Sequence, residues 1–354
     1  MNICLTLCLI NYNGERYLEE SLGSVFTQRE KFKEILLVDN ASADKSLQIV
    51  NERFPGVKVV KLGNNLGPGA ARNVGFKTAS ADLILFMDND VYLSSECPDR
   101  LLEAISDNPL AAAAMPRVLY ADRRDLIQYD GADSHFLGLM TLHNVNQPVS
   151  SSVNGTRKIN SLVTACFLVD RRKWEEEGAT FDDSFIFNYE DHDFGLRARI
   201  RGYEILSVPT ARCYHGEGTD RLSLREGKNY SRVRVYCLIR NRWQLILKNY
   251  QFKTIFLLSP MFFVYEVFQL AGVIGKGWLS EWLKALFWIF SHPAEILEKR
   301  RIVQKSRKTP DREILSGGPV PYSTELIKSP LERAGKNLLD LLAMFYWGKM
   351  KRFI

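Results

Sequence analysis

Two aspartates separated by one asparagine, Asp88-Asn89-Asp90, form the first group of side chains in this sequence that could do chemistry. They directly follow the apolar segment 82–87, so they leave a strand-like run with little conformational freedom. Carboxylates at this spacing can share a hard divalent cation that keeps other coordination positions for diphosphate oxygens. Such an ion would neutralise the charge that develops on a diphosphate leaving group. The alternative is a simple turn, because Asp and Asn are common after strands.

A second acidic group, Glu190-Asp191-His192-Asp193, follows the aromatic run 185–189. Aromatic neighbours lower the hydration of a carboxylate, so one of these groups could act as a general base on a hydroxyl. The group also begins a helix-like stretch that carries arginines toward its end at Gly202. Acidic residues suit the first turn of a helix and basic residues its last turn, so a capped surface helix is the alternative.

A glycine-rich segment and one histidine complete the candidate residues. Residues 65–75 match neither GxGxxG nor GxxxxGK[ST], which excludes a dinucleotide-binding loop or a P-loop. Arg72 falls early in a predicted helix whose amino end could face a phosphate, or it is an ordinary surface arginine. His215 stands between a strand-like run and glycines. A lone histidine is more often structural, but a site with two aspartates has room for an imidazole ligand.

Alternating strand-like and helix-like segments position the first group. Short apolar runs predict buried parallel strands, and apolar residues at every third or fourth position predict helices. The expected strands are 3–10, 34–38, 57–61 and 82–87, and the expected helices are 15–28, 45–54 and 70–80. Ser42 and Asp44 offer N-cap chemistry for the second helix. This order predicts an α/β fold, a parallel sheet with helices on both faces.

A polar side chain follows each of these four strands. In chain order these are Asn11 and Asn13, then Asp39, then Asn65, then Asp88 and Asp90. The carboxyl ends of parallel strands lie at one edge of a sheet, where open α/β sheets bind their ligands. The sequence therefore predicts a polar binding crevice at this edge.

Charge is distributed unevenly along the 354 residues. Residues 231–354 hold 21 Lys and Arg and 9 Asp and Glu, whereas residues 1–230 hold 26 and 32. Positive charge combined with long apolar runs favours an anionic membrane face over nucleic acid as the partner. The six cysteines form no CxxC pair, and residues 1–10 lack the features of a signal peptide, so we expect a cytoplasmic compartment.

The segment 254–275 contains no Lys, Arg or Asp and is near the roughly 20 residues that a spanning helix needs. Glu266 interrupts it, and a carboxylate at the bilayer centre costs about 2.5–3.5 kcal/mol. Interfacial or re-entrant attachment, a true span and a soluble helical subdomain all stay open. We expect a catalytic domain over 1–230 and a basic, aromatic-rich helical segment, associated with a membrane, over 231–354.

Taken together, these motifs resemble glycosyltransferase family 2, the inverting enzymes of the GT-A fold, and especially its rhamnosyltransferase-like branch. The resemblance covers roughly residues 3–220 and depends on the order and spacing of several modest motifs. These are Asn11-Tyr12-Asn13, residues 38–44, 65–67, 71–75 and 88–90, Glu190-Asp191 with Asp193, and His215.

The resemblance implies a role for each candidate residue. Asp191 would be the catalytic base, and Glu190 and Asp193 would position the acceptor or the donor. Asp90 would bind the metal, with His215 as a second contact. The residues expected to bind the nucleotide sugar are Asn11, Asn13, Asp39 (at the nucleobase), Asn65, Arg72, Asp88 (at the ribose) and Asn89.

The implied reaction moves one sugar from a nucleotide-sugar donor to a hydroxyl of a glycan or lipid-linked acceptor, assisted by Mn²⁺ or Mg²⁺. Its setting would be polysaccharide or cell-wall biosynthesis at the cytoplasmic face of the cell membrane, with peripheral, re-entrant or single-span attachment. The QxxRW signature of processive synthases is absent, since Ile239 precedes Arg242-Trp243 where it needs Gln. A nucleotidylyltransferase would need an activating loop that is missing. A non-catalytic, membrane-attached scaffold with a nucleotide-sugar-binding fold is the remaining alternative.

Overall fold

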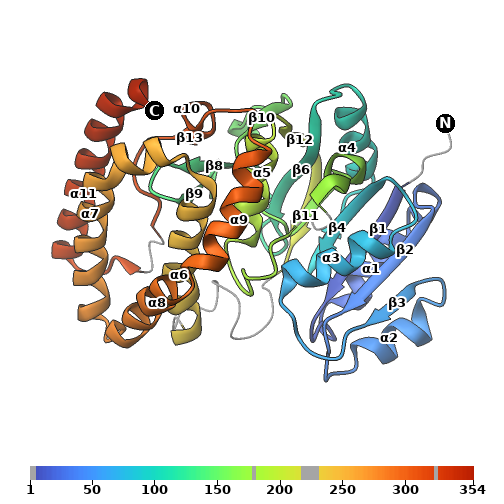
Figure 1. Ribbon diagram of the computed structural model, residues 1–354. Helices are drawn as coiled ribbons and strands as arrows, with labels where there is room; N and C mark the ends of the chain where they lie inside the picture. The colour runs from blue at the N-terminus through green and yellow to red at the C-terminus, as the bar shows by residue number, and fades with distance from the viewer. Residues whose placement is uncertain (1–4, 178–180, 217–230, 323–325) are drawn as a thin grey trace. The chain divides into compact units, whose positions relative to one another are not determined.

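The computed structural model describes residues 5–177, 181–216, 231–322 and 326–354 (Figure 1). The chain forms two compact units. The first comprises residues 1–132, 142–194 and 203–226, and the second comprises residues 133–141, 195–202 and 227–354. The domain boundary expected at residue 230 lies outside the described residues.

The first unit is built on four parallel strands. They are β1 (Leu5–Asn11), β2 (Glu34–Asp39), β3 (Lys58–Lys61) and β4 (Leu83–Asp88). β1 pairs with both β2 and β4, and β2 pairs with β3. All four expected strands are confirmed within two residues, because each is a local apolar run bounded by polar residues.

The sheet continues beyond β4 with strands of mixed direction. They are β5 (Val91–Leu93), β6 (Ala111–Tyr120), β7 (Ile127–Tyr129), β10 (Arg157–Ile159), β11 (Cys166–Asp170) and β12 (Glu204–His215). The order is β10-β12-β6-β11-β4-β1-β2-β3, with β5 beside β12 and β7 beside β6. Because β11 runs antiparallel to β4 and β6, the sheet is parallel only in part.

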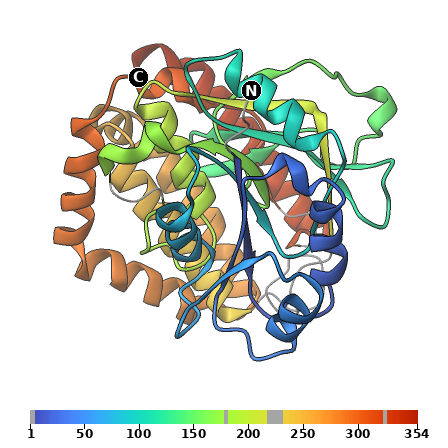
Figure 2. The same cartoon turned by 90° about the vertical axis from the view of Figure 1, so that its right-hand side faces the viewer.

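Helices cover this sheet on both faces, as expected. The first four are α1 (Leu18–Phe26), α2 (Ser46–Arg53), α3 (Pro68–Thr78) and α4 (Cys97–Ser106). Figure 2 shows α1 and α3 on opposite sides of the strands. A Cβ at Gly75 would lie 2.3 Å from Sγ of Cys8, so only glycine lets α3 pack this closely on β1. This close packing sets the position of the side chains that α3 carries toward the strand ends.

The second unit is mainly helical. Its helices are α6 (Arg232–Asn249), α7 (Phe252–Gly275), α8 (Leu279–Ser291), α9 (Pro293–Lys305), α10 (Asp311–Ile314) and α11 (Pro330–Met350). A three-stranded sheet joins β8 (Ala132–His135), β9 (Leu139–Leu142) and β13 (Leu315–Ser316). Helix α5 (Glu190–Ile200) begins in the first unit and ends in the second. Short 3₁₀ turns cover Arg29–Lys31, Val149–Ser151, Arg171–Glu177 and Lys351–Phe353.

Within the part of the chain that the structure describes, α7 is the one helix long and apolar enough to cross a membrane. Its central carboxylate does not face away from the protein. Glu266 Oε1 accepts hydrogen bonds from Arg242 Nη1 at 2.6 Å and from Trp243 Nε1 at 3.0 Å, both on α6. The group that we expected to be costly in lipid is therefore paired inside the helical unit.

Candidate functional site

Asn11, the last residue of β1, joins the ends of three neighbouring strands. Its Nδ2 donates to Asp39 Oδ1 at 2.8 Å and to Ser42 Oγ at 3.0 Å. Its Oδ1 accepts a hydrogen bond from Asn89 Nδ2 at 2.9 Å. The side chains that sequence placed at separate strand ends thus meet at one edge of the sheet.

Ser42 fixes the turn after β1 and was misassigned from the sequence. Its Oγ accepts a hydrogen bond from Asn13 N at 2.9 Å, and its own N donates to Asp39 Oδ2 at 3.0 Å. The N-cap of α2 is instead Lys45, whose side chain makes no capping bond to any described residue. The N-cap prediction for Ser42 was wrong because its hydroxyl has better partners across the strand ends, 29 and 31 residues away in sequence.

Asn65 belongs to a second pair of amides at this edge. Its Oδ1 accepts from Asn40 Nδ2 at 2.8 Å and from Gly67 N at 2.9 Å. Asn40 is buried, and its Oδ1 accepts from Leu66 N at 2.9 Å. These bonds shape the loop that leads into α3. The sequence analysis did not single out Asn40, although its place directly after Asp39 was a usable signal.

Arg72 of α3 is a buried cation at the centre of the site. Its Nη2 forms an ion pair with Asp88 and donates to the Thr164 carbonyl oxygen at 2.9 Å. The guanidinium is only 1% exposed, so the alternative of an ordinary surface arginine is wrong. Burial raises the pKa of Asp88, and the charge of Arg72 opposes that rise. Arg72 therefore offsets part of the effect of burial on the Asp88 carboxylate.

The second acidic group lies beside the first. Glu190 and Asp193 are buried, so the alternative of a capped surface helix is wrong. Burial raises the pKa of both Glu190 and Asp191, and the charge of Arg72 lowers both. The negative charge of Asp88 raises the pKa of each as well. Arg72 and Asp88 therefore act in opposite directions on the two carboxylates at the start of α5.

Helix packing and local bonds hold the start of α5 in this place. A Cβ at Gly69 of α3 would lie 3.3 Å from Cβ of Glu190. Asp191 Oδ1 accepts a hydrogen bond from His192 N at 2.7 Å, which stabilises its ionised form. Burial lowers the pKa of His192 to about 3, so its imidazole is neutral at physiological pH. Asp191 is half-buried, whereas Glu190 and Asp193 are buried, so Asp191 is the most accessible carboxylate of this group.

Asp90 and His215 face one another where β5 pairs with β12. Strand β5 pairs with β12 and sets Val91 opposite His215, which brings His215 Nε2 to 3.3 Å from Asp90 Oδ1. His215 Nδ1 lies 2.8 Å from Gln128 Oε1. An amide oxygen accepts a hydrogen bond from Nδ1–H, so the lone pair of the neutral ring stays on Nε2, toward the carboxylate.

This pair fits a divalent cation by the chemistry of its donor atoms. One carboxylate oxygen and one imidazole nitrogen that converge are ligands that Mn²⁺ and related ions accept. The structure describes no group of three or more His, Cys, Asp or Glu side chains, among residues 5–177, 181–216, 231–322 and 326–354, that could hold a metal by itself. Asp90 and His215 would therefore need further oxygen ligands from a bound molecule.

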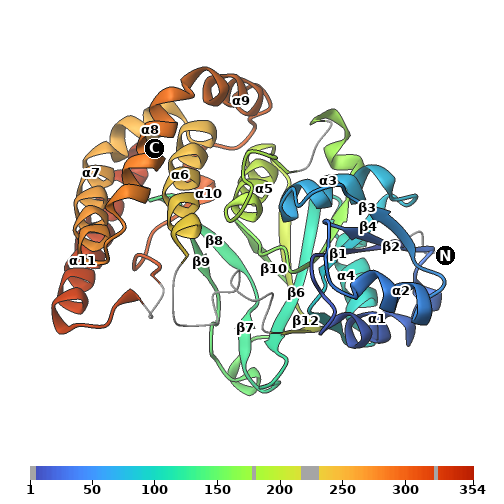
Figure 3. The same ribbon diagram turned by 90° about the horizontal axis from the view of Figure 1, so that it is seen from below.

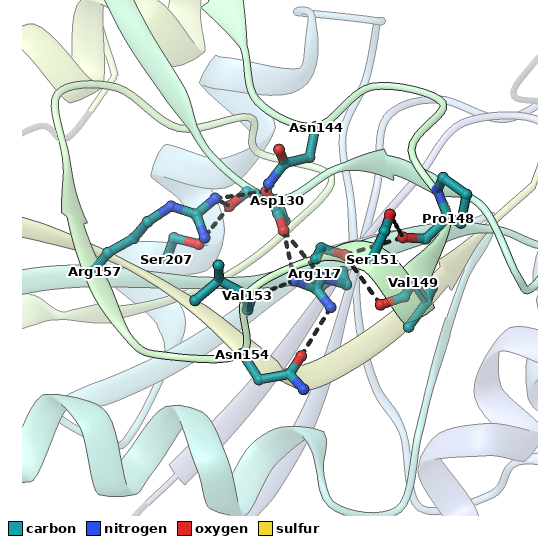
Figure 4. A network of polar contacts seen from close by, with 11 residues as sticks. Arg117, Asp130, Asn144, Pro148, Val149, Ser151, Val153, Asn154, Arg157 and Ser207 are labelled. Atoms are coloured by element: carbon teal, nitrogen blue, oxygen red, sulfur yellow. Dashed lines mark hydrogen bonds and ion pairs between the residues drawn. The ribbon is translucent and has the colours of Figure 1, made fainter.

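A buried ion-pair network stabilises the strand that carries Gln128. Figure 4 shows Asp130, directly after β7, between two arginines and an amide. It accepts from Arg117 Nε at 3.0 Å, Arg157 Nη2 at 2.6 Å and Asn144 Nδ2 at 2.9 Å. Sequence reasoning missed Gln128, because it lies in a loosely patterned stretch and contacts His215 across 87 residues.

Residues 6–163 match the family model described as "Glycosyl transferase family 2". The match contains the β1, β2 and β4 strand ends, Arg72 and the Asp88-Asn89-Asp90 triplet.

Two curated relatives and one solved structure agree with this match. An uncharacterized glycosyltransferase of Haemophilus influenzae is 36% identical over 102 residues, which are 28% of this chain and 41% of that protein. The N-acetylglucosaminyl-diphospho-decaprenol L-rhamnosyltransferase of Mycobacterium tuberculosis is 27% identical over 239 residues, or 61% and 76% of the two chains. The chain thus spans less than half the length of the first relative.

The solved structure of GalNAc-T7 with UDP, GalNAc and Mn²⁺ superposes with a TM-score of 0.59 at 16% identity. The superposition covers 76% of this chain and 51% of that one. At this identity the likeness concerns the fold, which is the curled, mixed α/β sheet of the GT-A type.

Proposed function

Because residues 6–163 match the model of glycosyltransferase family 2, we propose that this chain is a member of that family and moves one sugar from a nucleotide-sugar donor to a hydroxyl group with inversion at the anomeric carbon. The observation that carries this proposal is the packing of the start of α5 on α3: a Cβ at Gly69 would lie 3.3 Å from Cβ of Glu190, and Arg72 of the same helix α3 pairs with Asp88. It supports a base and a donor site at the same edge of one sheet.

The donor would lie along the strand ends that Asn11 joins. Asp39, with Asn11 and Asn13 beside it, would contact the nucleobase, and Asp88 with Asn89 would contact the ribose. Asn65 and Arg72 would act indirectly in this site. Asn65 shapes the loop before α3, and Arg72 pairs with the Asp88 carboxylate.

Asp191 would act as the general base. One oxygen of its carboxylate takes the proton of the acceptor hydroxyl as that oxygen attacks the anomeric carbon. The new C–O bond forms while the bond to the diphosphate oxygen breaks, and the nucleoside diphosphate leaves with the bonding electrons. Glu190 and Asp193 would position the acceptor or the donor indirectly, through the start of α5, since both are buried and offer little surface of their own.

Asp90 and His215 would hold Mn²⁺ or Mg²⁺, with Gln128 fixing the tautomer of His215. The ion would neutralise charge on the departing diphosphate. Two protein ligands leave coordination positions for phosphate oxygens, which supports a metal that binds together with the donor. The Mn²⁺ in the similar GalNAc-T7 structure supports the same assignment.

A glycan or lipid-linked molecule would be the acceptor, at the cytoplasmic face of the cell membrane, in polysaccharide or cell-wall synthesis. The name of the mycobacterial relative includes a diphospho-decaprenol, which is a lipid-linked sugar carrier. The basic, apolar second unit supports membrane association of the enzyme.

Release of nucleoside diphosphate from UDP-, GDP- and dTDP-sugars, with Mn²⁺ and with and without lipid-linked acceptors, tests this function. We expect turnover of one nucleotide class that depends on the metal. If no donor is turned over by the wild-type chain and Asp191→Asn changes nothing, the non-catalytic scaffold is the better account.

A further inference from the structure

Helix α7 exposes a continuous apolar stripe on one side. Phe256, Phe263, Val267 and Ile274 are between 51 and 78% exposed, and their spacing of four or seven residues aligns them on a single helix side. The opposite side packs inside the unit, where Glu266 bonds to Arg242. Only one side of α7 is therefore open to a partner, and it is mainly apolar, with Ser259 and, at its start, Lys253 as its exposed polar side chains.

Helix α11 exposes a second stripe of the same kind. Leu331, Leu338, Leu341 and Phe345 are between 51 and 82% exposed, and they also recur at helical spacing. The opposite side of α11 is buried, and its Trp347 stacks on Phe136 with ring centroids 5.0 Å apart.

The two helices lie side by side and antiparallel, as Figures 1 and 3 show. Tyr346 Oη donates to the Leu257 carbonyl oxygen at 2.6 Å, and Lys276 Nζ bonds to Glu332 at the other end. Because each stripe points away from the side that packs inside the unit, both lie on one surface. We call these two stripes the α7–α11 face.

Positive charge gathers at one end of the α7–α11 face. The Tyr346–Leu257 bond shows that the start of α7 lies beside the end of α11. The start of α7 carries Lys253, and the end of α11 and the turn after it carry Lys349, Lys351 and Arg352. All four cations are exposed. Lys351 and Arg352 also line a hollow of about 450 Å³ with Arg312 and a single acid, Glu313.

We propose that the α7–α11 face lies flat on an anionic membrane, with its apolar side chains among the acyl chains and its basic end at the headgroups. Amphipathic helices with these two features bind in the plane of the interface. A spanning α7 does not suit the structure, because lipid would have to replace α6 around Arg242 and Glu266. A second copy of the chain is disfavoured. Among the described residues at the other end of the face, Glu332 is already paired with Lys276, so it offers no acidic surplus to the cations.

This inference deepens the proposed membrane association, and its test is separate from donor chemistry. The full chain is added without detergent to preformed vesicles of phosphatidylcholine, alone or mixed with phosphatidylglycerol, and binding is measured by flotation. We expect binding to the anionic vesicles that is at least about tenfold stronger than to the neutral ones. The double variant Phe263→Glu/Phe345→Glu should bind at least about tenfold more weakly, because two exposed rings that would enter the acyl chains are replaced by charges.

The matched control is Leu110→Glu/Val153→Glu, which places the same charges on exposed apolar positions of the first unit. Vesicle binding of this control should equal that of the wild type, and donor turnover should be the same in all three proteins. Equal vesicle binding by the α7–α11 variant would overturn the proposal, as would a need for detergent to keep the wild type in solution. A dimer that the α7–α11 substitutions dissociate, without any vesicle binding, would assign the face to a second copy instead.

Discussion

The two units of this molecule depart from the usual arrangement of side chains in opposite ways. The first unit buries charged groups, among them Arg72, Glu190 and Asp193, whereas the second exposes large apolar ones such as Phe263 and Phe345. Buried charges cost free energy unless they are paired, and exposed apolar patches are rare in soluble monomers. In the first unit, several of these buried charges lie where strands end, and in the second the exposed apolar side chains lie on helices, many of them on α7, α8 and α11. The buried charged groups suit chemistry on a small molecule, and the exposed apolar groups suit the proposed attachment to a membrane.

The largest expected effect is on catalysis in the first unit. Asp191→Asn should lower the rate of sugar transfer by about 10²–10⁴-fold, because an amide cannot accept the proton of the acceptor hydroxyl. Nucleotide binding should stay unchanged, since Asn keeps the size of the side chain. The matched control is Asp99→Asn on α4, the same change at an exposed carboxylate outside the site. A transfer rate equal to that of the wild type would remove Asp191 from the mechanism.

The next effect is on stability and tests whether the buried charges are truly paired. Arg72→Met should lower the free energy of unfolding by roughly 3 kcal/mol, because it leaves Asp88 and Glu190 without their cation. Arg53→Met removes an exposed ion pair with Glu19 and should cost less than about 1 kcal/mol. Urea denaturation of the two variants measures the difference. If both variants lost the same free energy of unfolding, Arg72 would contribute no more to stability than an exposed arginine does.

A smaller effect concerns the residue that supports His215. Gln128→Leu should weaken Mn²⁺ binding, measured by electron paramagnetic resonance with nucleoside diphosphate present, by about 10–100-fold. Gln128→Glu keeps an acceptor oxygen 2.8 Å from Nδ1 and should retain the affinity. Undiminished Mn²⁺ binding by the leucine variant would argue that His215 is not a ligand.

The smallest effect is a shift in pH dependence. Only the ionised carboxylate of Asp191 accepts a proton, so kcat/KM should fall as the pH drops through its pKa. Burial raises that pKa, which moves the fall above the ordinary aspartate value of about 3.9. A pH–rate profile that stays flat down to the ordinary range would contradict a buried base.

Much of the first unit could be predicted from the sequence because its signals are local. The strands β1, β2 and β4 are apolar runs that end at Asn11, Asp39 and Asp88, and a parallel sheet brings such ends together. The partners of Arg72 and Ser42 could not be predicted, because they depend on contacts between residues far apart in sequence. Arg72, for example, bonds to the Thr164 carbonyl oxygen across 92 residues.

The second unit was less predictable for a related reason. The apolar segment 254–275 was visible, but the sequence could not decide among attachment, a span and a soluble helix. The Arg242–Glu266 ion pair shows which side of α7 packs inside the unit. The sequence alone could not show that the apolar stripe of α11 lies beside that of α7, because the two helices are far apart in the chain.

Calorimetric titration with UDP, GDP and dTDP in the presence of Mn²⁺ tests the central claim, that the polar edge of the first unit binds the nucleotide of the donor. We predict that one of these nucleotides binds the wild type, and that Asp39→Ala weakens it at least about tenfold, by loss of a buried carboxylate contact. Phe263→Glu, in the second unit, should bind that nucleotide as the wild type does. Equal affinity of the wild type and Asp39→Ala, or no nucleotide binding at all, would contradict the account.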